Sequence, residues 1–143
     1  MSFDIYLQCF QNGEPEYFNR AIFEEIFRRD AIGPDNFPSR VVYADGGAEI
    51  YVDSDKEIDG FMTNHCGGDT FFTALFELAD RTGGVVFWPD EGRTMAVTKP
   101  EVIDQLPEDM IESLGRPFIV RSGHELQDVI REQVDPPDSA SSA

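Results

Sequence analysis

The sequence predicts an α+β fold in a single domain, residues 1–134, with a mostly antiparallel sheet of about six to seven strands and three main helices packed on it. Short apolar runs with period-two alternation lie between turn residues and indicate strands. Longer segments repeat apolar residues at helical spacing. Hairpins are interleaved with helices along the chain, which favours an antiparallel sheet with helices on one face.

The first half of the chain predicts a strand, a helix, a hairpin and a further strand. Residues 3–10 alternate as a strand does, with one apolar side made by Phe3, Ile5, Leu7 and Cys9. An amphipathic helix follows, capped by Asn19 and ended by Gly33-Pro34; its apolar stripe is Phe18, Ile22, Phe23, Ile26 and Phe27. Strands 41–43 and 50–52 flank the turn Asp45-Gly46-Gly47. Residues 57–66 form the next strand.

The second half predicts four helices, two of them short, and three strands before an unstructured end. A strong helix, capped by Asp69 or Thr70, is closed by Gly83-Gly84, and strands 85–88 and 95–97 form a hairpin. Thr98 with Glu101 and Ser122 with Glu125 have the spacing of capping boxes. A short helix over 107–114 and a strand over 118–120 lie between them, and the last helix has Leu126, Val129, Ile130 and Val134 on one face. Residues 135–143 have nothing to bury, and we expect them to be disordered.

The charge of the chain limits the classes of partner. Twenty-eight Asp and Glu against 11 Lys and Arg give a formal net charge of −17. Such a field repels phosphate backbones and anionic lipid surfaces and attracts basic proteins, so we expect no nucleic acid and no membrane as partner. We expect a cytoplasmic protein without a signal peptide, with two reduced cysteines and no cofactor. The oligomeric state stays open.

The densest acidic run is Asp53, Asp55, Glu57 and Asp59, which we predict to be a binding surface. Counted from Asp55, the acidic residues lie at positions 1, 3 and 5 and a glycine at position 6, as in a calcium-binding loop. Position 12, however, is Cys66 instead of a bidentate Glu, and strands are predicted where helices would be required. A helix–loop–helix calcium site is therefore excluded, while weak cation binding through Asp55, Glu57 and Asp59 stays open.

A second acidic surface is predicted on the short helix, at Glu108, Asp109 and Glu112. Glu108 and Glu112 are one turn apart, so they face the same way and repel each other slightly. The surface can speed capture of a basic partner, or it can simply keep the protein soluble.

The stretch from Asn64 to Thr70 contains His65, Cys66 and a diglycine before a helix start. A helix N-terminus lowers the pKa of a thiol, so His65 and Cys66 are the candidate catalytic residues of a small enzyme. Two arguments oppose this interpretation. The carboxylate of Asp69 competes for the helix N–H groups, and adjacent residues of a strand point to opposite faces. A buried, inert Cys66 is the alternative.

Three aromatic residues close to strand ends, Tyr43, Tyr51 and Trp88, are candidate interface residues, since aromatic rings among carboxylates suit contact with Arg or Lys. Aromatic residues on strands also fill cores. No motif of a known enzyme class is present. The leading hypothesis is a non-enzymatic protein-binding module that engages a basic partner, in the manner of an immunity protein or antitoxin. The alternatives are the small enzyme and the weak cation binder.

Overall fold

An eight-stranded sheet runs through the centre of the computed structural model, which describes residues 4–33 and 37–134. Its strand order is β10-β9-β8-β1-β7-β5-β4, and β2 pairs with the end of β1. The strands are β1 (Ile5–Gln11), β2 (Glu14–Pro15), β3 (Phe18–Asn19), β4 (Arg40–Tyr43), β5 (Gly46–Tyr51), β6 (Glu57–Ile58), β7 (Gly60–Gly67), β8 (Gly84–Phe87), β9 (Met95–Val97) and β10 (Phe118–Ile119). The helices are α1 (Arg20–Arg28), α2 (Asp69–Thr82), α3 (Pro100–Ile103), α4 (Glu108–Leu114) and α5 (Gly123–Val134).

The predicted fold class is confirmed. Every pairing in the sheet is antiparallel except that of β10 with β9. Both predicted hairpins form, β4 with β5 and β8 with β9. The additional strands β2 and β3 have two residues each, which is too short for a periodic signal in the sequence. The predicted strand over 57–66 is divided into the short β6 and the long β7.

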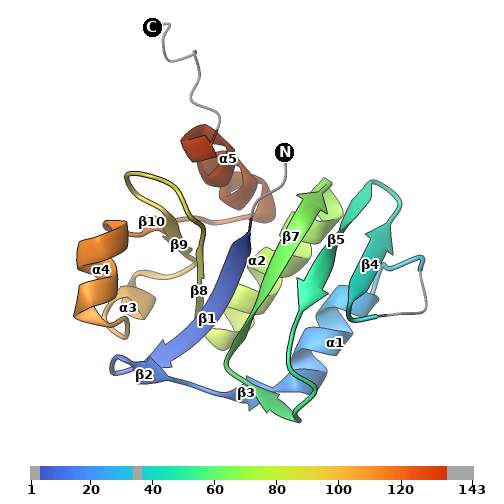
Figure 1. The fold of residues 1–143 in the computed structure, drawn as a ribbon, viewed down its shortest axis with the longest axis horizontal. Helices are drawn as coiled ribbons and strands as arrows, with labels where there is room; N and C mark the ends of the chain where they lie inside the picture. The colour runs from blue at the N-terminus through green and yellow to red at the C-terminus, as the bar shows by residue number, and fades with distance from the viewer. Residues whose placement is uncertain (1–3, 34–36, 135–143) are drawn as a thin grey trace, which may run out of the picture.

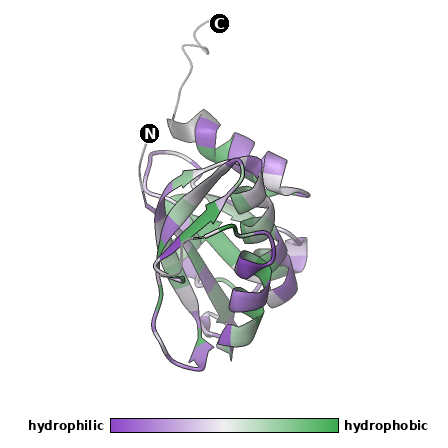
Figure 2. Ribbon diagram, turned by 90° about the vertical axis from the view of Figure 1, so that its right-hand side faces the viewer, coloured by the Kyte–Doolittle hydropathy of each residue, from purple (hydrophilic) through white to green (hydrophobic). Residues whose placement is uncertain are grey.

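The three main helices α1, α2 and α5 cover one face of the sheet. The alternating residues Ile5, Leu7 and Cys9 of β1 point to this side, where they meet Phe23 and Phe27 of α1 and the buried residues of α2. Seen edge-on in Figure 2, the helices lie on one side of the sheet with apolar segments between the two layers. This layer is the principal core.

The other face of the sheet is covered only at one end. Val85 and Val97 lie on the opposite face from Val86 and Ala96, and they form a second core with α3 and α4 through Val102 and other apolar side chains. Figure 1 shows α3 and α4 beside β8, β9 and β10, and no helix in front of β7, β5 and β4. Among the described residues, the second face of β1, β7, β5 and β4 therefore has no helix packed on it; we call it the open face.

Two predicted helix boundaries are wrong for the same reason: at each, a backbone group bonds to a residue of another element. Helix α1 starts after Asn19, whose side chain accepts from the Ala21 N–H at 2.8 Å as predicted, but it ends at Arg28 and not at Gly33. Gly33 instead forms a β-bridge with the edge strand β4, where its carbonyl accepts from the Val42 N–H at 2.7 Å. Helix α2 begins after Gly68 and has no cap from Asp69 or Thr70. The carboxylate of Asp45, in the β4–β5 turn, accepts from the Thr70 N–H at 3.1 Å.

The two predicted capping boxes differ in outcome. Ser122 accepts from the Glu125 N–H at 3.1 Å, and the Glu125 carboxylate accepts from the N–H of Arg121 at 2.7 Å, one residue before the expected donor. The Thr98 box does not form, because α3 begins at Pro100 after Lys99 and the Thr98 hydroxyl is buried without a partner.

Some predictions fall outside the described residues: those for Phe3, for Pro34, for the side chain of Val134 and for the end of the chain, residues 135–143. No helix in the described part of the chain is long and apolar enough to cross a bilayer.

Candidate functional site

The register of four neighbouring strands places four large side chains in one line, three on the open face and the fourth, Phe87 of β8, packed against the second core. Met62 pairs with Tyr51 on one side and with Tyr6 on the other, and Tyr6 pairs with Phe87. The Tyr6 and Phe87 rings stack, with centroids 5.1 Å apart and planes 10° apart. Tyr51 is 49% exposed. We call these four residues the aromatic row; Tyr, Phe and Met are residue types enriched at protein interfaces.

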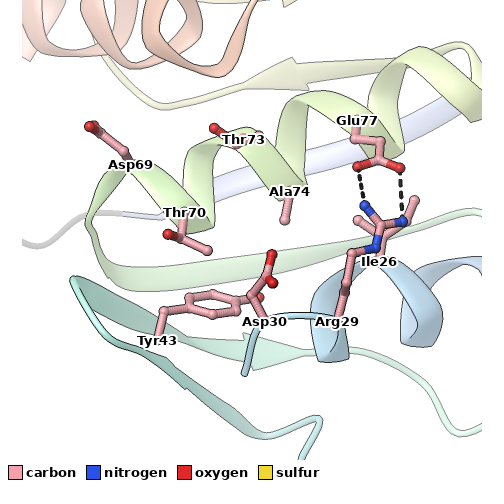
Figure 3. Close-up of a pocket in the computed structure, with 9 residues that line it drawn as sticks. All are labelled: Ile26, Arg29, Asp30, Tyr43, Asp69, Thr70, Thr73, Ala74 and Glu77. Atoms are coloured by element: carbon pink, nitrogen blue, oxygen red, sulfur yellow. Dashed lines mark hydrogen bonds and ion pairs between the residues drawn. The ribbon is translucent and has the colours of Figure 1, made fainter. Parts of the chain in front are cut away.

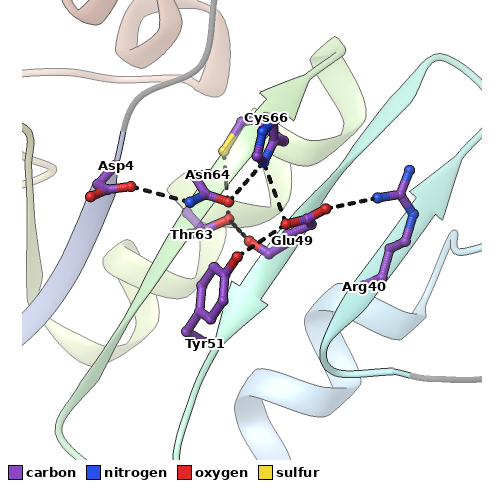
Figure 4. Close-up of polar contacts among 8 residues, drawn as sticks. Asp4, Arg40, Glu49, Tyr51, Thr63, Asn64 and Cys66 are labelled. Carbon is purple, nitrogen blue, oxygen red and sulfur yellow. Dashed lines mark hydrogen bonds and ion pairs between the residues drawn. The ribbon is translucent and has the colours of Figure 1, made fainter.

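A polar network lies next to the aromatic row, centred on the carboxylate of Glu49 (Figure 4). One oxygen accepts from the Tyr51 hydroxyl at 3.0 Å and lies 3.4 Å from Nδ1 of His65. The other oxygen lies 3.3 Å from the guanidinium of Arg40. The hydrogen bond to the carboxylate raises the pKa of Tyr51, because it favours the protonated phenol. Glu49 thereby fixes the position of the exposed Tyr51 ring.

The network continues across β7 to β1. Asn64 donates to a carboxylate oxygen of Asp4 at 3.2 Å, and its own carbonyl oxygen lies 3.1 Å from Nδ1 of His65. With Glu49 paired opposite Asn64, one side of the aromatic row thus has two carboxylates, those of Glu49 and Asp4. The negative charge expected from the composition is therefore present on the open face.

His65 and Cys66 lie together in a β-bulge of β7, which turns their side chains in different directions. Glu49 pairs with Asn64 and Gly47 with Gly67, so two residues of β7 lie opposite one residue of β5. His65 takes the left-handed conformation, with φ 53°, and is exposed. Cys66 turns toward the core, where its sulfur lies 3.5 Å from the Thr63 hydroxyl. The two candidate catalytic side chains therefore have different neighbours.

The environment of Cys66 is that of a structural thiol. Burial raises its pKa to about 11, although the hydrogen bond with Thr63 acts in the opposite direction. Burial likewise raises the pKa of Cys9 to about 11. Because the thiolate is the nucleophile, a thiol with this pKa is unreactive at neutral pH. The enzyme hypothesis gains no support from this site.

A shallow hollow of about 270 Å³ lies along one side of the aromatic row. Gly60 forms part of its lining, together with Tyr6, Gln8, Tyr51 and Phe87. Asp53, two residues beyond the end of β5, also lines it. At Gly60 the β7 backbone approaches β1 so closely that a Cβ would clash with the Leu7 carbonyl oxygen.

The predicted acidic run is divided by the fold. Asp53 and Asp59 line the same hollow, whereas Asp55 and Glu57 are exposed beyond it. The Asp59 carbonyl accepts from the Cys9 N–H at 2.8 Å, and the Asp59 charge adds to the effect of burial in raising the pKa of that thiol. Among the described residues, no three acidic, His or Cys side chains are grouped as metal ligands, so Asp55, Glu57 and Asp59 form no such group.

The second predicted acidic surface is far from the hollow. Glu108, Asp109 and Glu112 are exposed on α4, at the β9 end of the sheet, on the opposite side of the molecule from β4 and β5 in Figure 1. Helix α4 packs the half-buried side chains of Met110, Ile111 and Leu114 against the second core. Its acidic residues therefore form a separate surface.

A smaller groove of about 190 Å³ lies between α1, α2 and the β4 strand (Figure 3). Arg29 of α1 and Glu77 of α2 close one end with two hydrogen bonds of 2.9 and 3.0 Å. Tyr43 forms part of the wall, and its buried hydroxyl donates to the Phe27 carbonyl at 2.7 Å. Since these polar groups bind one another, the groove joins the two helices and offers little to a ligand.

Of the three candidate interface aromatics, only Tyr51 is exposed; Tyr43 and Trp88 are 3% and 1% exposed and belong to the core. The sequence reasoning missed Tyr6, Met62 and Phe87. For Tyr6, the sequence contained a signal that was not used. Asp4, Tyr6 and Gln8 alternate with the buried residues of the first strand, so they lie on its opposite face.

Comparisons with protein families, with curated proteins and with solved structures give no match to this chain.

Proposed function

We propose that the protein is a non-enzymatic binding module whose open face engages a basic protein partner. The observation that carries the proposal is the aromatic row, of which Tyr6, Met62 and Tyr51 lie where no described helix covers the sheet. Neighbouring strands are about 4.8 Å apart, so a row that crosses four strands is about 14 Å long. Such a surface suits a short segment of another protein.

Charge supports a basic partner. Asp4 and Glu49 lie on one side of the row and Asp53 on the other. Arg40 is the cationic group beside them, and it approaches the carboxylate of Glu49, as the His65 ring also does. Complementary charge speeds association and makes it sensitive to salt, while the aromatic residues contribute the contact area. The net charge of −17 disfavours nucleic acid as the partner.

A concrete form of this function is an immunity or antitoxin-like inhibitor. Proteins that act on nucleic acids have basic clefts, and an acidic surface with projecting aromatic side chains can occupy such a cleft. In this form of the proposal, Tyr51 and Asp53 enter the basic cleft of the partner. The acidic helix α4 has no aromatic residues beside its carboxylates and takes no part in the contact.

The test is site-specific photo-crosslinking in extracts of the source cells. A benzophenone amino acid replaces Tyr51 in one variant and the exposed Ala21 of α1 in a matched control. We expect position 51 to crosslink one basic protein at low salt, with the yield falling steeply as salt is raised. Position 21 should not label that protein.

Labelling of the same protein from position 21 alone, or labelling from position 51 that salt does not affect, would contradict the proposed surface. A product that is itself acidic would contradict the charge argument.

A further inference from the structure

On the open face, the hollow at Gly60 is lined by aromatic rings, by two acidic residues and by Gln8. We propose that this hollow receives a single arginine side chain of the partner. The inference rests on the proposed function and specifies the residue type by which the partner is recognised.

The walls suit a planar cation. Tyr6 and Tyr51 line the hollow from β1 and β5; both pair with Met62 of β7, two residues from Gly60. A guanidinium stacks on aromatic faces and is more weakly hydrated than an ammonium, so it loses less on entering a space between rings. Phe87, stacked on Tyr6, holds that ring in place.

The hollow also has acceptors for the N–H groups of arginine. Asp53 supplies a carboxylate at its rim. Gln8 lies against Gly60, and its Oε1 is 2.8 Å from the point that a Cβ at position 60 would occupy. The Gln8 Nε2 donates to the Cys9 carbonyl at 3.4 Å, which leaves the Oε1 as the atom turned to the hollow. Guanidinium has five N–H donors in one plane, whereas an ammonium is a point charge that cannot match this spread of acceptors.

Tyr51 is a fixed wall before any partner binds. Its hydroxyl donates to Glu49 at 3.0 Å, and Glu49 is in turn paired with Arg40. Because the Tyr51 ring is already ordered, binding a partner costs less side-chain conformational entropy than it would with a mobile ring. The Glu49 network and the hollow therefore act together, one positioning the ring and the other accepting the side chain.

The test compares two probes of equal charge, hexa-arginine and hexa-lysine, by NMR titration of the ¹⁵N-labelled protein at low salt. We expect hexa-arginine to shift the amide signals of Gln8, Tyr51 and Gly60, and to bind several-fold more tightly than hexa-lysine. Tyr51→Ala and Asp53→Asn should each weaken hexa-arginine binding roughly fivefold, which corresponds to the loss of one exposed cation–π contact or ion pair. The matched control is Glu108→Gln with Glu112→Gln on α4, which removes two charges and should leave the affinity for hexa-arginine nearly unchanged.

Equal affinity for the two peptides, or signal shifts confined to α4, would overturn the arginine assignment. Such a result leaves the proposed function intact if position 51 still crosslinks a basic protein. Specific hexa-arginine binding without a crosslinked partner supports the arginine site and contradicts the proposed partner surface.

Discussion

Gly60→Ala is the sharpest test of the packing between the two central strands. A Cβ at position 60 would lie 2.2 Å from the Leu7 carbonyl oxygen and 3.0 Å from the Gln8 Cα, both backbone atoms of β1. Because β1 is paired on its other edge with β8, it cannot move away without disturbing a second ladder. Overpacking a rigid site costs about 1–3 kcal/mol, and a backbone clash belongs at the upper end. We expect a loss of about 3 kcal/mol in the free energy of unfolding and a fall in Tm of roughly 10 °C.

Gly67→Ala is the matched control, since it is the same substitution on the same strand. Its Cβ meets no atom within 4 Å, and its backbone is not in the left-handed region. We expect no loss, and a gain of up to about 1 kcal/mol from the reduced freedom of the unfolded chain. Urea denaturation followed by fluorescence of the buried Trp88, the only tryptophan, measures both variants. If Gly60→Ala matched Gly67→Ala within about 0.5 kcal/mol, the strand pairing deduced here would be refuted.

Three further predictions concern other parts of the fold. His65→Gly should raise the free energy of unfolding by about 1 kcal/mol, because a residue other than glycine is strained at φ 53°; a clear loss in urea denaturation would contradict this. Cys9 and Cys66 should make stability pH-dependent, since folding raises both pKa values from 9.0 to about 11. Stability should be complete below pH 9 and fall by roughly 2 kcal/mol per thiol as the pH rises to 11; denaturation midpoints equal at pH 8 and 10.5 would show the thiols to be solvated. Gly123→Ala should cost about 1–3 kcal/mol, because its Cβ would lie 2.6 Å from the backbone of Thr73 in α2, and an unchanged Tm would argue against the close α2–α5 contact.

Elements whose partners are local were predictable from the sequence. The hairpin at Asp45-Gly46-Gly47, the Asn19 cap and the end of α2 at Gly83 depend on neighbours a few residues away, and each is present. The cap of α2 was mispredicted because its acceptor, Asp45, is 25 residues earlier in the chain. The end of α1 was mispredicted because Gly33 bonds to β4, a partner that only the folded sheet supplies.

The sequence by itself determined the α+β class, the helices with their apolar stripes and the negative charge of the surface, because periodicity and composition are properties of the chain alone. Only the tertiary structure decided which face of the sheet remains uncovered and which side chains meet there. Tyr6, Tyr51 and Phe87 come from three separate strands, and strand register, which brings them into one row, depends on long-range pairing. The same pairing turned Cys66 toward the core and separated Asp53 from Asp55 and Glu57. The candidate site therefore could not be predicted from local sequence patterns.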